Sequence, residues 1–152
     1  MQKNSSANTQ DSKVFITGAS SGIGYALCEE YLKQGWSVIG LGRDNTKIPP
    51  TTLNNTKFEF IKTDLADFDS SKSIIEEVFK KNRNINTFIL NAGIYIPDSF
   101  NDFNFENAKL TFNTNVLSIY LSLELIRKNF KLDSKNTIAL MSSTAGYKGL
   151  PK

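Results

Sequence analysis

The chain has 152 residues, enough for one domain and too few for two of ordinary size. Its composition, 39% apolar and 22% charged, is typical of a globular protein, and a net charge of +3 is too small to indicate nucleic-acid binding. The absence of histidine excludes a Ser-His-Asp triad and most zinc sites, so we expect no metal site.

The ends of the chain and its one cysteine indicate the cellular setting. No apolar segment reaches the roughly 18 residues that a membrane span requires, so we expect no membrane partner. Residues 1–12 are polar, lack the apolar core of a secretory signal, and are predicted to form a disordered tail. Cys28 has no partner for an internal disulfide, and we expect a small buried residue rather than a reactive thiol. These features predict a cytoplasmic protein with one domain over residues 13–152.

Apolar, strand-like runs alternate with helical patterns along the chain. Strands are predicted over residues 13–18, 36–42, 57–64, 85–93 and 136–142. Helices are predicted over residues 22–35, 69–82 and 104–130, and a loop is predicted over residues 45–56. This alternation predicts an α/β fold of three layers, a doubly wound parallel sheet of Rossmann type with strand order 3-2-1-4-5.

The helix predicted over residues 104–130 is apolar on two sides. One row contains Phe105, Phe112, Val116, Ile119, Leu123 and Ile126. A second row contains Leu117, Leu121 and Leu125. A helix of this kind packs against a sheet and also against a neighbouring or partner helix. We therefore expect a homodimer or homotetramer when the protein is complete.

The motif TGASSGIG (Thr17–Gly24) joins the first strand to the first helix. Its first glycine permits a sharp turn, and the other two let the helix N-terminus approach a bound pyrophosphate closely. The residues predicted to contact this group are Gly18, Ser20, Ser21, Gly22, Ile23 and Gly24. A glycine-rich turn without a ligand is the plainer alternative. The Walker phosphate loop is excluded because no Gly-Lys-Ser/Thr follows.

This motif resembles the TGxxxGIG signature of the short-chain dehydrogenase/reductase superfamily at every fixed position. The resemblance extends from about Lys13 to Pro151. It implies an NAD(P)-dependent oxidoreductase that moves hydride between nicotinamide and a small-molecule carbonyl or alcohol. A methyltransferase on a similar sheet is a weaker alternative, because the family's motifs have no reason to occur together there.

The end of the second strand indicates which dinucleotide is bound. It reads LGRD (Leu41–Asp44), and NAD-preferring Rossmann folds carry an acidic residue at the position of Gly42. Arg43 follows, and its guanidinium suits a 2′-phosphate. We expect NADP(H) to be favoured over NAD(H), although Asp44 weighs slightly against this. The alternative is that Arg43 is an ordinary surface charge.

The resemblance implies roles for residues at two further strand ends. Asp64 and Leu65, in TDL, would contact the adenine. Asn91, Ala92 and Gly93 form the NAG motif, which would lie against the nicotinamide-side ribose, with the asparagine bracing adjacent strands. The plainer alternative for each position is a turn residue at the end of a strand.

Two residues match part of the family's catalytic set. Asn115, in the TNV segment of the long helix, would prop a proton-relay water, unless it simply faces solvent. Ser143, in SSTAG, would hold the substrate carbonyl oxygen. With no histidine to act as its base, Ser143 is not expected to be a nucleophile.

The Tyr-x-x-x-Lys pair that supplies the proton in this family does not occur in the sequence. We expect it just beyond Lys152, and Tyr147, followed at the fourth position by Pro151, is not expected to replace it. The chain is thus expected to be a cofactor half, truncated at its C-terminus. It could be a fragment of a longer reductase, the product of a disrupted gene, or a short regulatory or dinucleotide-binding protein without catalysis. The gene sequence downstream of Lys152 would discriminate these alternatives.

Overall fold

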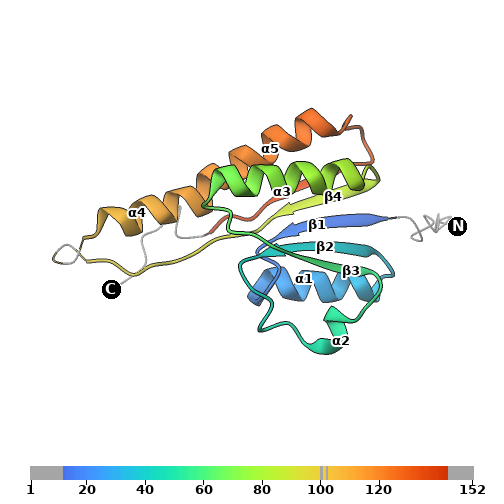
Figure 1. Cartoon of the computed structure of the whole chain (residues 1–152), viewed down its shortest axis with the longest axis horizontal. Coiled ribbons are helices and arrows are strands. Elements are labelled where there is room, and N and C mark those ends of the chain that lie inside the picture. The colour runs from blue at the N-terminus through green and yellow to red at the C-terminus, as the bar shows by residue number, and fades with distance from the viewer. Residues whose placement is uncertain (1–11, 100, 102, 144–152) are drawn as a thin grey trace, which may run out of the picture.

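The computed structural model describes residues 12–99, 101 and 103–143 (Figure 1). The tail predicted over residues 1–12 lies outside the described residues apart from residue 12. The elements follow in the order β1 (Lys13–Thr17), α1 (Gly22–Lys33), β2 (Ser37–Gly42), α2 (Pro50–Leu53), β3 (Phe58–Lys62), α3 (Phe68–Lys81), β4 (Ile85–Leu90), α4 (Phe105–Phe112), a π-helical turn (Asn113–Leu117), α5 (Ser118–Asn129) and β5 (Thr137–Leu140).

The strands form one parallel sheet in the order β3-β2-β1-β4-β5. Helices α1 and α2 cover one face, and α3 and α5 cover the other (Figure 1). The predicted three-layer fold and strand order are therefore confirmed. The strand order reverses between β1 and β4, and in such sheets ligands bind beside the carboxyl ends of the strands at this point.

The two faces of the sheet bury separate apolar clusters. Beneath α3 and α5, four phenylalanine rings contact one another, with centroids 5.1 Å apart for Phe15 and Phe79 and 4.9 Å apart for Phe88 and Phe130. On the other face of the sheet, Cys28 of α1 is fully buried in the second cluster, as predicted. This burial raises the pKa of its thiol to about 12.

The segment predicted as a loop contains a short helix, so this prediction is wrong over α2. Pro50 occupies the first helical turn, where its fixed φ angle is favourable and its missing N–H is not needed. The hydroxyl groups of Thr52 and Tyr25 lie 2.9 Å apart and form a hydrogen bond between α2 and α1. A contact between residues so distant in sequence could not be read from the local pattern.

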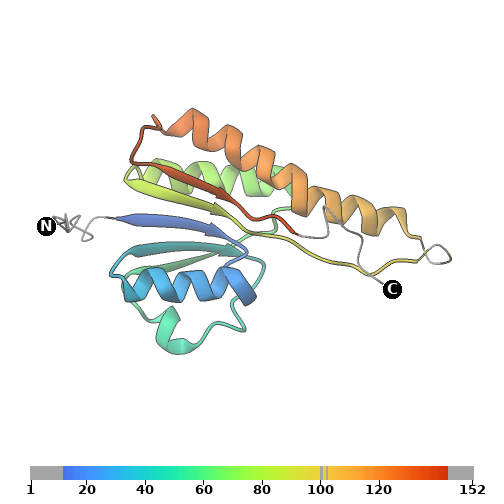
Figure 2. The same ribbon diagram turned by 180° about the vertical axis from the view of Figure 1, so that it is seen from behind.

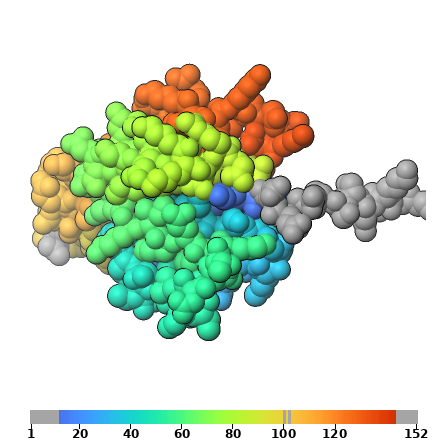
Figure 3. Space-filling model, turned by 45° about the vertical axis from the view of Figure 1, so that its right-hand side comes forward, coloured from blue at the N-terminus to red at the C-terminus, as the bar shows by residue number. Residues whose placement is uncertain are grey.

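The helix predicted over residues 104–130 is present but divided. A π-helical turn separates α4 from α5, and α4 buries none of its side chains. Figure 1 shows α4 extending beyond the sheet, and Figure 3 shows this light-orange part of the chain at the left edge of the molecule. Two of its phenylalanines, Phe105 and Phe112, are 68% and 63% exposed. The apolar pattern predicted burial along the whole helix. Among the described residues of this helix, only those of α5 include buried apolar side chains.

Strand β5 lies at the edge of the described sheet, next to β4 (Figure 2). Most residues of this strand are exposed to solvent, and Leu140 is 53% exposed. Its backbone pairing with β4 continues past the strand, because the Met141 N–H donates a hydrogen bond to the Leu90 carbonyl at 3.0 Å.

Candidate functional site

The turn between β1 and α1 forms one wall of the site. Gly18 has a φ angle of +69°, in the left-handed region that favours glycine. A Cβ atom at this position would also lie 2.8 Å from the Cα atom of Ala92, which is closer than real Cβ contacts allow. Glycine therefore serves both the predicted sharp turn and the close approach of the loop after β4.

Thr17 and Asn91 join the ends of the neighbouring strands β1 and β4. The Thr17 hydroxyl accepts hydrogen bonds from the N–H groups of Asn91 and Ala92, both at 3.0 Å. The Asn91 side-chain amide donates in return to the Thr17 carbonyl at 3.1 Å and to the Gly18 carbonyl at 3.3 Å. The sequence reasoning anticipated the bracing by Asn91 but missed Thr17, whose role depends on a strand distant in sequence.

Gly24 is buried in the first turn of α1. A Cβ atom there would lie 2.1 Å from the Gly18 carbonyl oxygen and 2.5 Å from the Asn91 amide nitrogen. No side chain fits in this space without moving backbone atoms. Packing within the protein is therefore sufficient to require glycine at this position, independently of any ligand.

The N-terminus of α1 points a helix dipole at the same region. Ser21 is the N-cap residue, but its side chain makes no capping hydrogen bond, and the first turn contains no acidic residue. The backbone N–H groups of this turn and the positive end of the dipole favour an anion. Local structure at this terminus is thus compatible with phosphate binding.

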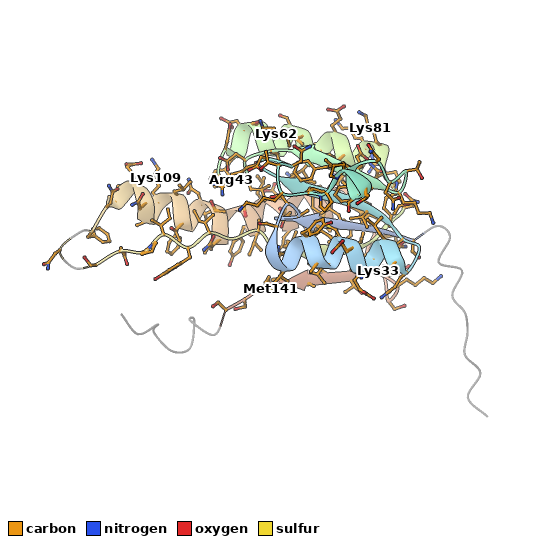
Figure 4. The ribbon with its side chains drawn as sticks, turned by 90° about the horizontal axis from the view of Figure 1, so that it is seen from below. Lys33, Arg43, Lys62, Lys81, Lys109 and Met141 are labelled. Carbon is orange, nitrogen blue, oxygen red and sulfur yellow. The ribbon has the colours of Figure 1, made fainter. Side chains whose placement is uncertain are left out.

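A cavity of about 380 Å³ lies at the carboxyl ends of the strands. It is lined by every residue predicted to contact a cofactor except Gly24, namely Gly18, Ser20, Ser21, Gly22, Ile23, Arg43, Asp64, Leu65, Asn91, Ala92 and Gly93. Figure 4 shows Arg43 and Met141 towards this end of the sheet, with Lys33 and Lys81 towards the other. Volumes of this order suit small-molecule ligands.

The lining also contains residues that the sequence reasoning missed: Gly42, Thr63, Ile94, Thr114 and Met141. Thr63 and Ile94 directly adjoin predicted residues at strand ends, so their positions alone could have indicated them. Thr114 enters from the helical side. Its orientation depends on the π-helical turn, which carries no clear signal in the sequence.

At the end of β2, Arg43 is exposed and makes no hydrogen bond or ion pair within the described part of the chain. The carboxylate of Asp44 is engaged elsewhere, because it accepts hydrogen bonds from the Thr46 hydroxyl at 2.6 Å and the Thr46 N–H at 3.1 Å. These bonds lower the pKa of Asp44. The Ser20 hydroxyl lies on the same side, 3.2 Å from the position that a Cβ atom of Gly42 would occupy.

At the end of β3, the two predicted adenine contacts have different environments. Asp64 is exposed, and its carboxylate accepts a hydrogen bond from the Ala66 N–H at 3.0 Å. Leu65 is 5% exposed and packs in the cluster beneath α3 and α5. The pair thus offers a polar and an apolar group side by side at the cavity wall.

Asn115 lies in the π-helical turn, where its side chain faces the loop after β4. Its Nδ2 atom donates to the Ile94 carbonyl, and its Oδ1 atom accepts from the Ile94 N–H, both at 2.8 Å. Asn115 is half-buried, so the alternative of a solvent-facing side chain does not describe it. Extra residues in a helical turn of this kind often occur at functional sites.

Ser143 is the last described residue and is exposed. It follows Met141, which lines the cavity, by two positions. Tyr147, Pro151 and Lys152 lie outside the described residues, and so does the rest of the SSTAG motif after Ser143. In the described ranges, no cluster of three or more Asp, Glu, Cys or His side chains could hold a metal ion. None of the helices in these ranges is long and apolar enough to span a membrane.

Known proteins share this fold and sequence pattern. The chain is 31% identical over 137 residues to an uncharacterized oxidoreductase of Schizosaccharomyces pombe, covering 90% of the chain and 46% of that protein. It is 30% identical over 155 residues to the protochlorophyllide reductase of Marchantia paleacea, covering 96% of the chain and 34% of that protein. The chain thus spans less than half the length of these two relatives.

Solved structures give the same result. The structure of ElxO with NADP bound has a TM-score of 0.79 and 27% sequence identity, covering 92% of the chain and 58% of ElxO. The family model described as short chain dehydrogenase matches residues 12–152. This match includes almost all of the sequence, together with the turn between β1 and α1 and the NAG motif described above. The chain belongs to the short-chain dehydrogenase family.

Proposed function

We propose that this chain is the dinucleotide-binding half of an NADP(H)-dependent oxidoreductase, formed by one NAD(P)-binding domain over residues 13–152. The observation that carries the proposal is the cavity at the carboxyl ends of the strands, where residues from five separate strand ends meet. Family membership supports hydride transfer between nicotinamide and a carbonyl or alcohol carbon of a small molecule. The alternative of a glycine-rich turn without a ligand does not account for this convergence.

The pyrophosphate would lie against the turn between β1 and α1. Gly18 and Gly22 have φ angles of +69° and +56°, which turn the backbone beside the cavity. The Ser20 and Ser21 side chains line the same wall and can donate hydrogen bonds to phosphate oxygens. The helix N-terminus adds a favourable electrostatic interaction with the anion.

A preference for NADP(H) over NAD(H) is supported by the charges at the end of β2. Arg43 lines the cavity, so its guanidinium can bind a 2′-phosphate. The negative charge of Asp44 would oppose this phosphate, and Thr46 stabilises that charge through two hydrogen bonds. Ser20 can donate a further hydrogen bond from the adjoining loop. The ElxO structure, at 27% identity, holds NADP, which supports the binding of a nicotinamide dinucleotide at such a site.

The residues proposed for catalysis position groups rather than transfer protons. Asn115 fixes the backbone of Ile94 at the cavity wall, and in the proposed site it also props a relay water. Ser143 would orient the substrate carbonyl oxygen by donating a hydrogen bond. None of the tyrosines in the sequence is followed by lysine at the fourth position, so the chain itself lacks the expected acid/base pair.

Self-association is proposed to occur through α5. Leu117, the last residue of the π-helical turn, and Tyr120 of α5 are 44% and 69% exposed. With Phe68, Leu121 and Glu124 they line a shallow depression of about 430 Å³. Burying this apolar surface against a second copy would remove it from water, which favours a homodimer or homotetramer of the complete, cytoplasmic enzyme.

Equilibrium titration of the 152-residue chain with NADPH and NADH, followed by cofactor fluorescence and calorimetry, tests the proposal. We expect saturable binding of both dinucleotides, tighter for NADPH. No binding of either dinucleotide would contradict the proposed function.

A non-catalytic dinucleotide-binding protein is the second candidate, and no Tyr-x-x-x-Lys pair in the printed sequence argues against it. Both candidates bind NADPH, and a turnover assay tests whether this chain carries the full catalytic set. NADPH oxidation is to be followed with a broad panel of aldehydes and ketones. We expect binding without turnover, whereas robust turnover would show that the chain is catalytically complete.

A further inference from the structure

Thr63 directly follows β3 and combines burial with an unpaired polar group. The residue is 5% exposed and lines the cavity. Its hydroxyl oxygen is buried and has no hydrogen-bond partner, and no other buried side-chain nitrogen or oxygen in the described part of the chain is in this state. A buried hydroxyl without a partner has lost its contact with water and gained no bond in return, so it carries an uncompensated desolvation cost.

Two other buried hydroxyl groups in this fold have acceptors. Ser118 donates to the Thr114 carbonyl at 2.6 Å, and Ser122 donates to the Ser118 carbonyl at 2.8 Å. Valine has almost the shape of threonine and would fill the site of Thr63 without an unpaired group. The hydroxyl is therefore explained neither by packing nor by a partner among the described residues.

The position of Thr63 indicates which part of a ligand it would meet. Its N–H donates to the Gly42 carbonyl at 2.9 Å, which fixes Thr63 at the junction of the β2 and β3 ends. Arg43 follows Gly42, Asp64 follows Thr63, and both line the cavity. Thr63 thus lies between the residue proposed for the 2′-phosphate and the residue proposed for the adenine.

We propose that Thr63 is a binding residue for the adenosine end of the dinucleotide, an inference that rests on the function proposed above. A rotation of roughly 120° about χ1 moves the hydroxyl from one staggered position to another. In the new position it can donate a hydrogen bond to an adenine nitrogen or a ribose oxygen in the cavity. The ligand then supplies the partner that the free protein lacks.

Two substitutions separate the hydroxyl from the shape of the side chain. Thr63→Val keeps the shape and removes the hydroxyl, whereas Thr63→Ser keeps the hydroxyl. We expect the Kd for NADPH to rise about five- to tenfold in Thr63→Val and to change by less than about twofold in Thr63→Ser. Equal affinity of Thr63→Val and the wild type would overturn the inference.

Fragments of the dinucleotide locate the contact. Adenosine 2′,5′-bisphosphate carries the adenosine end, and nicotinamide mononucleotide carries the other end. Calorimetry should show that Thr63→Val weakens the first fragment as much as NADPH and leaves the second unchanged. Loss confined to nicotinamide mononucleotide would place the contact elsewhere and refute the inference.

Unfolding measurements without ligand identify a purely structural role. Because the hydroxyl is unpaired in the free protein, Thr63→Val should leave the urea midpoint unchanged or raise it. A lowered midpoint would show that the hydroxyl already has a partner, such as a buried water, and would overturn the proposal.

Thr87→Val is the matched control for these measurements. Thr87 is a threonine of β4 that is 7% exposed and does not line the cavity. Its substitution should leave the Kd for NADPH unchanged. If the wild-type protein bound no dinucleotide at all, both the proposed function and this inference would fail. If the wild type bound NADPH and Thr63→Val bound it equally well, only the inference would fail.

Discussion

The side-chain amide of Asn115 and the backbone of Ile94 form a closed pair of hydrogen bonds, each 2.8 Å long. One bond satisfies the Ile94 carbonyl and the other satisfies its N–H group. The pair connects the π-helical turn to the loop that follows β4. It therefore links a helix on one face of the sheet to the wall of the cavity.

Replacing Asn115 with alanine should destabilise the protein by about 1–3 kcal/mol, because both polar groups of Ile94 then lose their partner. Urea unfolding followed by circular dichroism measures this difference. Asn113→Ala is the control, since Asn113 lies in the same π-helical turn and forms no hydrogen bond through its side chain in the described structure. Its effect should stay within about 0.5 kcal/mol, and equal losses for the two variants would contradict the assignment.

Gly24→Ala should be far more damaging than Gly22→Ala. The new Cβ atom at Gly24 would lie 2.1 Å from a backbone carbonyl oxygen, whereas nothing lies within 4 Å of one at Gly22. The cost at Gly22 is the left-handed φ angle, roughly 1–2 kcal/mol. We expect a loss of more than about 3 kcal/mol at Gly24, or no folded protein. Thermal unfolding of both variants provides the test, and similar melting temperatures would be inconsistent with this packing.

Arg43→Ala should weaken NADPH binding by about tenfold or more, since a charge-assisted hydrogen bond to the 2′-phosphate is lost. NADH lacks this phosphate, so its Kd should change by less than about twofold. Both constants are measured by calorimetry at fixed ionic strength, because exposed charges are screened by salt.

Lys47→Ala is the control for Arg43, because it removes a cation from the same loop at a position that does not line the cavity. It should leave the preference for NADPH intact. An equal loss of NADPH and NADH affinity in Arg43→Ala would refute the role assigned to this arginine.

Cys28 should make the protein less stable at high pH. Its pKa is raised from an ordinary value of 9.0 to about 12, so above pH 9.0 the unfolded chain releases a proton that the folded chain retains. The free energy of unfolding then falls by up to about 1.4 kcal/mol per pH unit until the folded thiol also ionises. This contribution is complete below pH 9.0 and is lost as the pH rises towards 12.

Urea unfolding at several pH values, with Cys28→Ala as the reference, isolates the effect of this thiol from that of other titrating groups. The wild type should lose stability above pH 9.0 faster than the variant. Parallel curves for the two proteins would show that Cys28 ionises equally easily in the folded state.

Tyr120→Lys should dissociate the oligomer proposed to form through α5. The tyrosine is 69% exposed on the apolar side of this helix, and a lysine there would place a charge in the interface. Sedimentation velocity over a range of concentrations measures the effect. Tyr95→Lys replaces a tyrosine that is 72% exposed and outside this surface, and it should leave association unchanged. A wild-type chain that stays monomeric would contradict the proposal.

The sequence was sufficient to predict the sheet and most of the cavity wall. The strand order follows from the alternation of elements, and Gly18 and Gly22 after β1 have φ angles that favour glycine. These features depend on short-range patterns and on topological rules, which a sequence displays directly. The convergence of Arg43 and Asn91 then follows from the parallel sheet, which brings the carboxyl ends of its strands to one edge.

The features that the sequence did not reveal depend on distant contacts. Helix α2 is held by Thr52 through the hydroxyl of Tyr25, which lies on another helix. The π-helical turn interrupts a segment with uniform apolar spacing, and the Asn115 amide in this turn binds a loop that is distant in sequence. The unpaired hydroxyl of Thr63 likewise becomes visible only when the neighbouring atoms are placed.

The connection between β1 and β4 has a consequence for the thermodynamics of ligand binding. Four hydrogen bonds that involve Thr17 and Asn91 hold the two strand ends together in the free protein. This part of the backbone is therefore already ordered before a ligand arrives. Association then costs little protein conformational entropy at the floor of the cavity, and such pre-organisation increases affinity without adding a contact.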